Sequence, residues 1–261
     1  MNPARPPPAP RDSRLQASAC FSFDNLGEAA EVGAGRLAGP LAPGADPSLA
    51  VGHPRLLRLL ERRGVRASFF VEGWNGVHHP AQVAEIAARG HELGAHGWLH
   101  ETWHALDAAT EADRLRRATD ALRAAAGVAP VGFRAPGGSR TDATEGLLLE
   151  LGYRYDASLG ADMKPTRLPG GLAQIPFAWA GVDGAWYLRP EPAEPEAVRD
   201  AWLAALAKAA ERGGLFVLVC HAFITGVDEA RLAALEAVIE AAQRDARVAL
   251  RTLGEVAAAI P

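Results

Sequence analysis

The sequence carries two histidines four residues apart, a spacing typical of metal ligands. His96 and His100 lie in the stretch HELGAHGWLHE, just where a short apolar run ends. If this segment turns helically, side chains at i and i+4 share one face, about 5–6 Å apart at Cβ. Two imidazoles at that separation can bind one divalent cation. The spacing alone fits two solvent-exposed loop histidines equally well, and their position after an apolar strand favours a metal site.

An acid and an amide end the first apolar run of the chain. Asp24 and Asn25 close the segment CFSFDN. A carboxylate at the end of a buried strand can bind a metal or take a proton from a metal-bound water. Asp and Asn are also common helix N-caps, and for this pair considered alone capping is the more frequent role. The histidines nearby in the pattern make Asp24 a candidate base.

Three further polar residues follow or end apolar runs and are candidates for acid–base chemistry. His221 follows LFVLVC and could protonate a leaving amine near neutral pH, although a structural histidine is as common at such a place. Arg134, in FRAPGG, could keep a nearby acid ionised, or it could lie on the surface of a turn. Asp156 could orient Arg134 or His221, or cap a helix.

The tryptophans and cysteines are weaker signals. Trp98, Trp103 and Trp179 could line a pocket for a sugar or another ring, but aromatic residues lie more often in the core. The chain has two cysteines, Cys20 and Cys220, and each lies in an apolar run. Two thiols make no disulfide framework, so both are predicted to be buried and reduced.

These candidates are spread along a chain in which short apolar runs alternate with longer amphipathic runs. Strands are predicted at residues 19–23, 67–71, 92–95, 131–134, 153–157, 173–177, 186–188, 215–220 and 248–251. Helices are predicted at residues 54–63, 80–89, 110–126, 142–151, 194–211, 228–245 and 253–258. This order predicts a parallel sheet covered by helices, either open or closed as a barrel. Because reactive groups collect at the carboxyl ends of such strands, the candidates should share one rim.

Composition narrows the class of protein. The 261 residues are 49% hydrophobic and 22% charged, which suits a single globular α/β domain. The net charge of −4 argues against a generic nucleic-acid binder. Residues 1–16 are rich in Pro and Arg and lack a signal-peptide core, so a disordered leader is predicted before a domain spanning 17–261. No run of about 18 apolar residues occurs, so we expect no membrane partner and a cytoplasmic location.

Five short motifs in a fixed order resemble those of the polysaccharide deacetylase superfamily, the group with the NodB homology domain. The matching stretches are SFDN, HGWLH, RAPGG, YRYDASL and VCHAFITG, and they cover about residues 19–258. FFVEGWN, GHELGAHGWLHE and HAFITG further resemble the branch that contains allantoinase-like and peptidoglycan-deacetylase-like proteins.

This resemblance implies a distorted (β/α) barrel with about seven parallel strands and one divalent metal ion, commonly zinc, with cobalt, nickel or manganese as other candidates. The implied metal ligands are Asn25, His96 and His100. Asp24 would then be the general base and His221 the general acid. The implied supporting residues are Arg134, which would tune the base, and Asp156, which would shape the environment of the acid.

The sequence also departs from the family pattern. Asn25 offers a neutral oxygen where the family usually has an aspartate, Gly97 replaces a hydroxyl residue, and Ala222 replaces a proline. The resemblance implies hydrolysis of an acetamido group on a small or sugar-like substrate. A ring-opening hydrolase of cyclic amides and a non-catalytic carbohydrate-binding relative with a weakened metal site are the alternatives. A small-molecule or carbohydrate partner is expected, and a homo-oligomer is left open.

Overall fold

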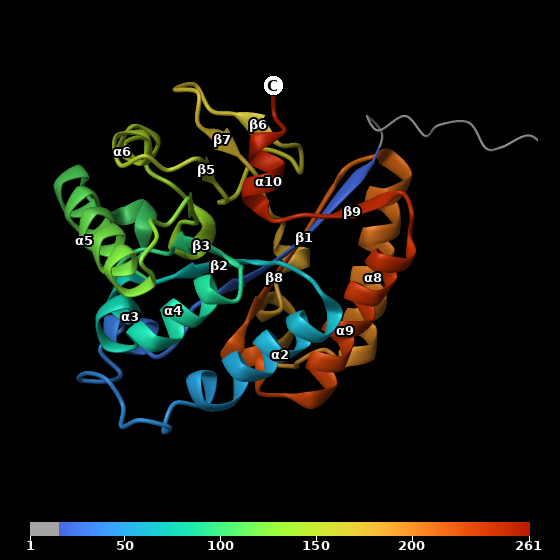
Figure 1. The fold of residues 1–261 in the computed structure, drawn as a ribbon, viewed down its shortest axis with the longest axis horizontal. Helices are drawn as coiled ribbons and strands as arrows, with labels where there is room; N and C mark the ends of the chain where they lie inside the picture. Colours follow the sequence, from blue (N-terminus) through green and yellow to red (C-terminus); the bar gives the residue numbers. More distant parts are fainter. Residues whose placement is uncertain (1–15) are drawn as a thin grey trace, which may run out of the picture.

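One curled sheet with helices outside it forms the body of the molecule (Figure 1). The computed structural model describes residues 16–261, so the predicted leader lies outside the described residues except for Gln16. The strands are β1 (Ala17–Asp24), β2 (Ser68–Val71), β3 (Glu92–Ala95), β4 (Gly132–Phe133), β5 (Tyr155–Asp156), β6 (Thr166–Arg167), β7 (Ala173–Gln174), β8 (Leu215–His221) and β9 (Val248–Leu250). The helices are α1 (Ala29–Gly33), α2 (His53–Arg63), α3 (Gly73–His78), α4 (Pro80–Ala88), α5 (Ala108–Ala126), α6 (Thr144–Glu150), α7 (Gly184–Tyr187), α8 (Pro195–Arg212), α9 (Glu229–Arg244) and α10 (Leu253–Ala258).

Short helical turns complete the set. They are η2 (Ser48–Gly52), η3 (Trp103–Ala105), η4 (Pro136–Gly138), η5 (Trp179–Gly181) and η6 (Ala222–Gly226). The turns η2 and η6 are π-helical and pack against each other. Because η6 directly follows β8, this contact fixes the chain at the exit of that strand.

The sheet runs in the order β6-β7-β5-β4-β3-β2-β1-β8, with β9 beside the start of β1. Every pair is parallel except β6 with β7. The sheet curls into a half-barrel, and helices α3, α4 and α5 cover one side while α8 and α9 cover another (Figure 1). The predicted distorted barrel in a single domain is thereby confirmed.

Strand β1, which pairs with β2, β8 and β9, sets the position of the site. All eight of its residues are buried, as expected for a parallel strand covered on both faces. Its register with β8 runs from Ser18 opposite Leu215 to Asp24 opposite His221. The carboxyl ends of these two strands therefore bring an acid and a histidine side by side on one rim.

A segment without regular pairing completes the barrel wall. After β7 the chain makes two isolated parallel bridges, Phe177 with Leu159 and Val182 with Val219. The backbone N–H of Asp183 also donates to the carbonyl of Val219 at 3.0 Å. Residues 175–183 thus cross from the β5–β7 side of the sheet to β8, and they carry Asp183 to the exit of that strand.

Most predicted elements are confirmed, and the exceptions have local causes. Residues 186–188 were expected to form a strand but overlap helix α7, because a run of three apolar residues carries no period that separates the two states. Helix α3 was not predicted. A Cβ at Gly73 would lie 2.2 Å from Cα of Ala118, so glycine lets this helix pack closely against α5. Strand β6 was also not predicted, and it has two residues.

Both cysteines are buried free thiols, as predicted. Between residues 16 and 261, the structure has no helix with the length and apolar character that crossing a membrane requires.

Candidate active site

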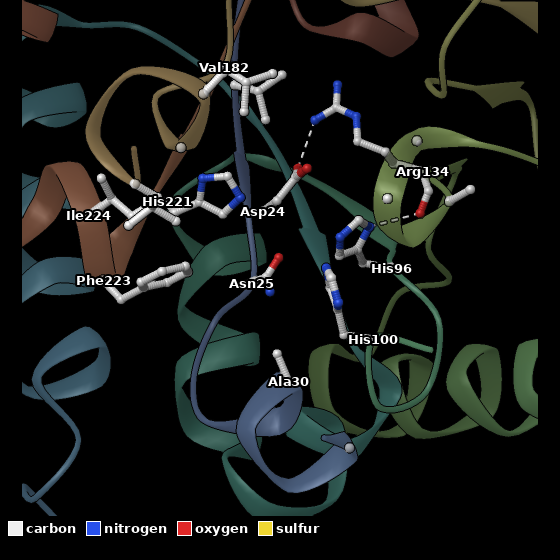
Figure 2. Close-up of a pocket in the computed structure, with 18 of the residues that line it drawn as sticks. Asp24, Asn25, Ala30, His96, His100, Arg134, Val182, His221, Phe223 and Ile224 are labelled. Atoms are coloured by element: carbon white, nitrogen blue, oxygen red, sulfur yellow. Dashed lines mark hydrogen bonds and ion pairs between the residues drawn. The ribbon is translucent and has the colours of Figure 1, made fainter. Parts of the chain in front are cut away.

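The carboxyl ends of β1, β3, β4 and β8 surround a cavity of about 720 Å³. Figure 2 shows Asp24 in the middle of this cavity, with His221 on one side and His96 and Arg134 on the other. Six of the residues predicted from the sequence to belong to the site line this cavity: Asp24, Asn25, His96, His100, Arg134 and His221. The structure brings these six residues together on one rim, whereas Asp156, which was expected there too, does not line the cavity.

Asp24 is a buried carboxylate held by an arginine. Arg134 Nη1 donates to Asp24 Oδ1 at 2.7 Å and to Ser22 Oγ at 3.0 Å. Burial alone would raise the pKa of Asp24, but the charges of Arg134, His96 and His221 outweigh it and lower the pKa overall. Asp24 is consequently ionised at neutral pH, as a base must be.

Arg134 is itself fixed on three sides. Its Nε donates to the carbonyl of Ala157 at 2.9 Å. Its guanidinium carbon lies 4.2 Å from the ring centre of Phe70 and 5.1 Å from that of Phe177. Such contacts favour the cation and restrict its motion. The side chain is 1% exposed, so the alternative of a surface arginine in a turn is wrong.

The two histidines of the HGWLH motif face the cavity as neutral rings. Their ring centroids are 5.0 Å apart. Burial lowers the pKa of His96 to about 3 and also lowers that of His100. His96 Nδ1 donates to the backbone carbonyl of Arg134 at 2.8 Å, which leaves Nε2 as the unprotonated nitrogen. Neutral imidazoles with a fixed tautomer are the form in which histidine binds metals.

Asn25 lies beside these rings with an unsatisfied oxygen. Its Oδ1 is buried and has no hydrogen-bond partner among the described residues. Its backbone has φ of 59°, a left-handed conformation that Asn adopts more readily than most residues. Within residues 16–261, no three His, Cys, Asp or Glu side chains are grouped as a metal site. The amide oxygen of Asn25 is a further buried oxygen in the cavity that the two histidines line.

The histidine loop and helix α1 touch through their backbones. A Cβ at Gly33 would lie 2.1 Å from the carbonyl oxygen of Leu99. The loop itself turns at Gly97, where φ is 72° and a Cβ would lie 2.7 Å from Glu101 Oε2. Glu101 accepts the backbone N–H groups of Trp98 and Leu99. The glycine in place of a hydroxyl residue at position 97 is thus required by this turn.

His221 is paired with an acid that the sequence reading did not identify. Its Nδ1 donates to Asp183 Oδ1 at 2.5 Å, and its backbone N–H donates to Asp183 Oδ2 at 2.8 Å. The hydroxyl of Thr225 also donates to Oδ2, at 2.6 Å. Burial alone would lower the pKa of His221, but the Asp183 carboxylate raises it above the usual value. Asp183 therefore favours the protonated form of His221.

Asp183 was missed because it ends no predicted strand. It lies at the end of the crossing segment 175–183, and the pattern AWAGVDG at residues 178–184 has neither a strand nor a helix period. The sequence around Asp183 shows only an acid that follows an apolar residue, and such acids are usually helix caps or surface residues.

Asp156 was expected to orient Arg134 or His221, and the structure shows that it contacts neither. This carboxylate is fully buried at the end of β5 and is bonded by Arg140 at 3.1 Å, Ser158 at 2.6 Å and Gln174 at 3.5 Å. The contacts of Asp156 reach neither Arg134 nor His221. It instead fixes the strand end next to β4, because Ser158 Oγ also accepts the N–H of Ala135 at 2.9 Å.

Two of the three tryptophans proposed for the pocket belong elsewhere. Trp103 is a core residue with 0% exposure, and its Nε1 donates to Glu111 and Thr144. Trp98 packs under the guanidinium of Arg117, 4.2 Å from the ring centre, outside the cavity. Only Trp179 of this group lines the cavity.

Comparison with known proteins explains this arrangement. A family model for polysaccharide deacetylases matches residues 45–155. A solved structure from Mycobacterium smegmatis, assigned to the polysaccharide deacetylases, is 31% identical, with a TM-score of 0.83 over 100% of this chain and 94% of that one. The chain belongs to the polysaccharide deacetylase family.

Other polysaccharide deacetylase relatives match in part. The peptidoglycan deacetylase of Helicobacter pylori is 38% identical over 109 residues, which is 42% of this chain and 37% of that protein. The chain spans less than half the length of the curated relatives it matches. An allantoinase structure shares the fold at 21% identity, with a TM-score of 0.79 covering 97% of this chain and 93% of that one.

Proposed function

We propose that this polysaccharide deacetylase relative hydrolyses the amide bond of an acetamido group on a small or sugar-like molecule. One observation carries the proposal. A carboxylate with a lowered pKa, Asp24, and an imidazole with a raised pKa, His221, end paired positions of adjacent strands and face one cavity. A base and an acid held in opposite protonation states are what amide hydrolysis needs, since a water must lose a proton and an amine must gain one.

The residues present fit a divalent metal ion. His96 and His100 are neutral, the Nε2 of His96 is free, and Asn25 Oδ1 is buried without a partner. These three side chains would hold the ion, with zinc as the first candidate because two of the donors are imidazoles. When bound, the ion would polarise the substrate carbonyl and make a water more acidic.

The two proton transfers of the reaction are assigned to side chains of the protein. Arg134 occupies Oδ1 of Asp24 and keeps it ionised, so Oδ2 is left to accept the proton of the attacking water. Asp183 fixes Nδ1 of His221 and leaves Nε2 to carry the proton toward the leaving amine. Transfer of that proton makes the nitrogen a neutral leaving group, which completes cleavage of the C–N bond.

Substitution of the two reacting groups tests the proposal. Asp24→Asn and His221→Ala should each lower kcat by about two to four powers of ten, the usual contribution of a general base or acid. The assay is acetate release from N-acetylglucosamine and its oligomers by the zinc-loaded protein. Circular dichroism and thermal unfolding would show that both variants remain folded.

Wild-type rates in either variant would remove its assigned role. Product analysis separates the deacetylase from a cyclic-amide hydrolase, because ring opening releases no acetate. Absence of turnover on every acetamide and cyclic amide by the zinc-loaded protein would instead favour a non-catalytic carbohydrate-binding protein.

A further inference from the structure

The cavity has two chemically different walls. The wall beside the two histidines is polar and includes Glu31, Arg36, Glu101 and Thr102. The wall beside His221, here called the apolar wall, is built from η5, α7, η6 and their neighbours. Its side chains are Trp179, Val182, Ala185, Leu188, Phe223 and Ile224.

Three members of the apolar wall are open to solvent. Trp179 is 50% exposed, Leu188 is 64% exposed and Phe223 is 42% exposed. They are three of the seven large hydrophobic side chains that are exposed within residues 16–261, and the other four do not line this cavity. Single exposed apolar residues are ordinary, but a group of them around a cavity marks a surface that a ligand covers.

The apolar wall lies on the side of the proposed acid. The ring centroid of Phe223 is 5.3 Å from that of His221, and the ring of Trp179 packs edge-on against Phe177 at 5.5 Å. Figure 2 shows Phe223 and Ile224 on the same side of Asp24 as His221, away from His96 and His100. If His221 protonates the leaving nitrogen, this wall must border the amine half of the substrate.

The wall can stack against the apolar face of a sugar, but it offers almost no hydrogen-bond partners for the hydroxyl groups. Each hydroxyl of a sugar needs a hydrogen-bond partner when it leaves water, and an unpaired one is costly. Of the six side chains in the wall, Trp179 alone carries a polar atom, its indole N–H, which can only donate. A flat apolar ring, by contrast, gains about 25 cal/mol for each Å² of apolar surface it buries there.

We propose that the amine half of the substrate is a flat apolar ring, so that the preferred substrate is an N-acetyl arylamine rather than an N-acetylated sugar. The orientation of the substrate in this inference rests on the role proposed for His221. The polar wall then faces the acyl half and whatever polar group it bears.

Direct binding tests the inference without depending on turnover. Acetanilide and N-acetylglucosamine would be titrated calorimetrically into the zinc-loaded Asp24→Asn protein, which slows hydrolysis. We expect acetanilide to bind at least about tenfold more tightly. In the same background, Trp179→Ala, Leu188→Ala and Phe223→Ala should each weaken acetanilide binding about three- to tenfold and change N-acetylglucosamine binding less than about twofold.

Val128→Ala and Leu149→Ala are the matched controls, because both side chains are exposed and neither lines the cavity. They should leave both affinities unchanged. Equal or tighter binding of N-acetylglucosamine, or wall variants that behave like these controls, would overturn the inference even if the wild-type protein is an active deacetylase. Tight, wall-dependent acetanilide binding without hydrolysis by the wild-type protein would leave the inference standing and reject the proposed function.

Discussion

The pKa values of Asp24 and His221 shift in opposite directions because each residue has a different partner. Arg134 lowers the pKa of Asp24 against the effect of burial, and Asp183 raises the pKa of His221 against the same effect. Neighbouring charges, not exposure, therefore decide which group is the base and which is the acid. Hydrogen bonds fix both partners: Arg134 donates to the carbonyl of Ala157, and Asp183 accepts from the hydroxyl of Thr225.

Asp183→Asn should move the alkaline limb of the pH–rate profile to lower pH. Loss of the carboxylate removes the interaction that raises the pKa of His221, so the imidazole loses its proton earlier as pH increases. The acid form is present below its pKa and lost above it, so activity at pH 8 should fall more than activity at pH 6. Measurement of kcat/KM from pH 5 to pH 9 checks this.

The control for that profile is Asp156→Asn. Asp156 is as deeply buried as Asp183, but its contacts are with Arg140, Ser158 and Gln174. Its removal should leave the alkaline limb where it is. A limb that moves equally in both variants would show that Asp183 has no specific effect on the acid.

At this scale, the position of a site residue can be predicted from the sequence where that residue ends a strand. Asp24, His96 and His221 follow apolar runs, so the strand pattern alone places them on one rim. Asp156 also ends a strand, but its side chain pairs with Arg140 and not with the acid. The true partner lies in a crossing segment, and the path of such a segment depends on tertiary contacts that no local pattern records.

At the scale of elements, the exit of β8 depends on the contact between η2 and η6. A Cβ at Gly52 would lie 2.1 Å from the carbonyl oxygen of Ala222, the residue after His221. A Cβ at Gly226 would lie 2.7 Å from Cα of Gly52. The two backbones meet without any side chain between them.

Gly52→Ala should destabilise the protein by about 1–3 kcal/mol, the usual cost of forcing an extra methyl group into a packed contact. It should also lower kcat, because Ala222 and the imidazole of His221 move with the displaced turn. Urea unfolding and acetamide hydrolysis provide the two measurements. Gly39→Ala is the control, since a Cβ there has no atom within 4 Å. A Gly52→Ala protein as stable as this control would contradict the packing argument.

Long elements were predictable and short ones were not. Helices α5, α8 and α9 extend over many turns, and their ends are set by local signals such as the Asp107 side chain that accepts the N–H groups of Ala109 and Thr110. Strands β4, β5 and β7 have two residues each where four or five were expected. Side chains replace part of the ladder there, as Ser158 Oγ does at Ala135.

At the scale of the whole molecule, a metal ion would link the first and third strands of the sheet. Asn25 and the two histidines lie on different segments of the chain. An ion bound by all three therefore binds the folded state and not the unfolded state, and it stabilises the fold. The neutral amide provides less attraction than a carboxylate would. The charge of residue 25 should therefore control how far zinc raises the melting temperature.

Asn25→Asp should bind zinc more tightly than the wild type and show a larger zinc-dependent increase in Tm, while Asn25→Gly should show the smallest. Glycine serves as the control because it accepts the positive φ at this position while removing the ligand. Elemental analysis and thermal unfolding with and without zinc give the comparison. Three proteins with the same zinc content and the same Tm shift would exclude residue 25 as a ligand.

The barrel form could not be read from periodicity alone. An open sheet and a closed barrel need the same alternation of strands and helices, and the family motifs were needed to separate them. The structure shows the physical reason, since the wall between β7 and β8 is completed by two isolated bridges at Phe177 and Val182. Two residue pairs leave no pattern that a sequence can reveal.

The close approach of Gly33 to the carbonyl of Leu99 has a consequence for how the cavity can change its width. Because their backbones are in direct contact, helix α1 and the histidine loop cannot move independently. The polar wall that they carry should therefore be rigid. A cavity that widens for a bulkier substrate should therefore widen at the apolar wall, where the side chains of Leu188 and Phe223 are partly exposed to solvent.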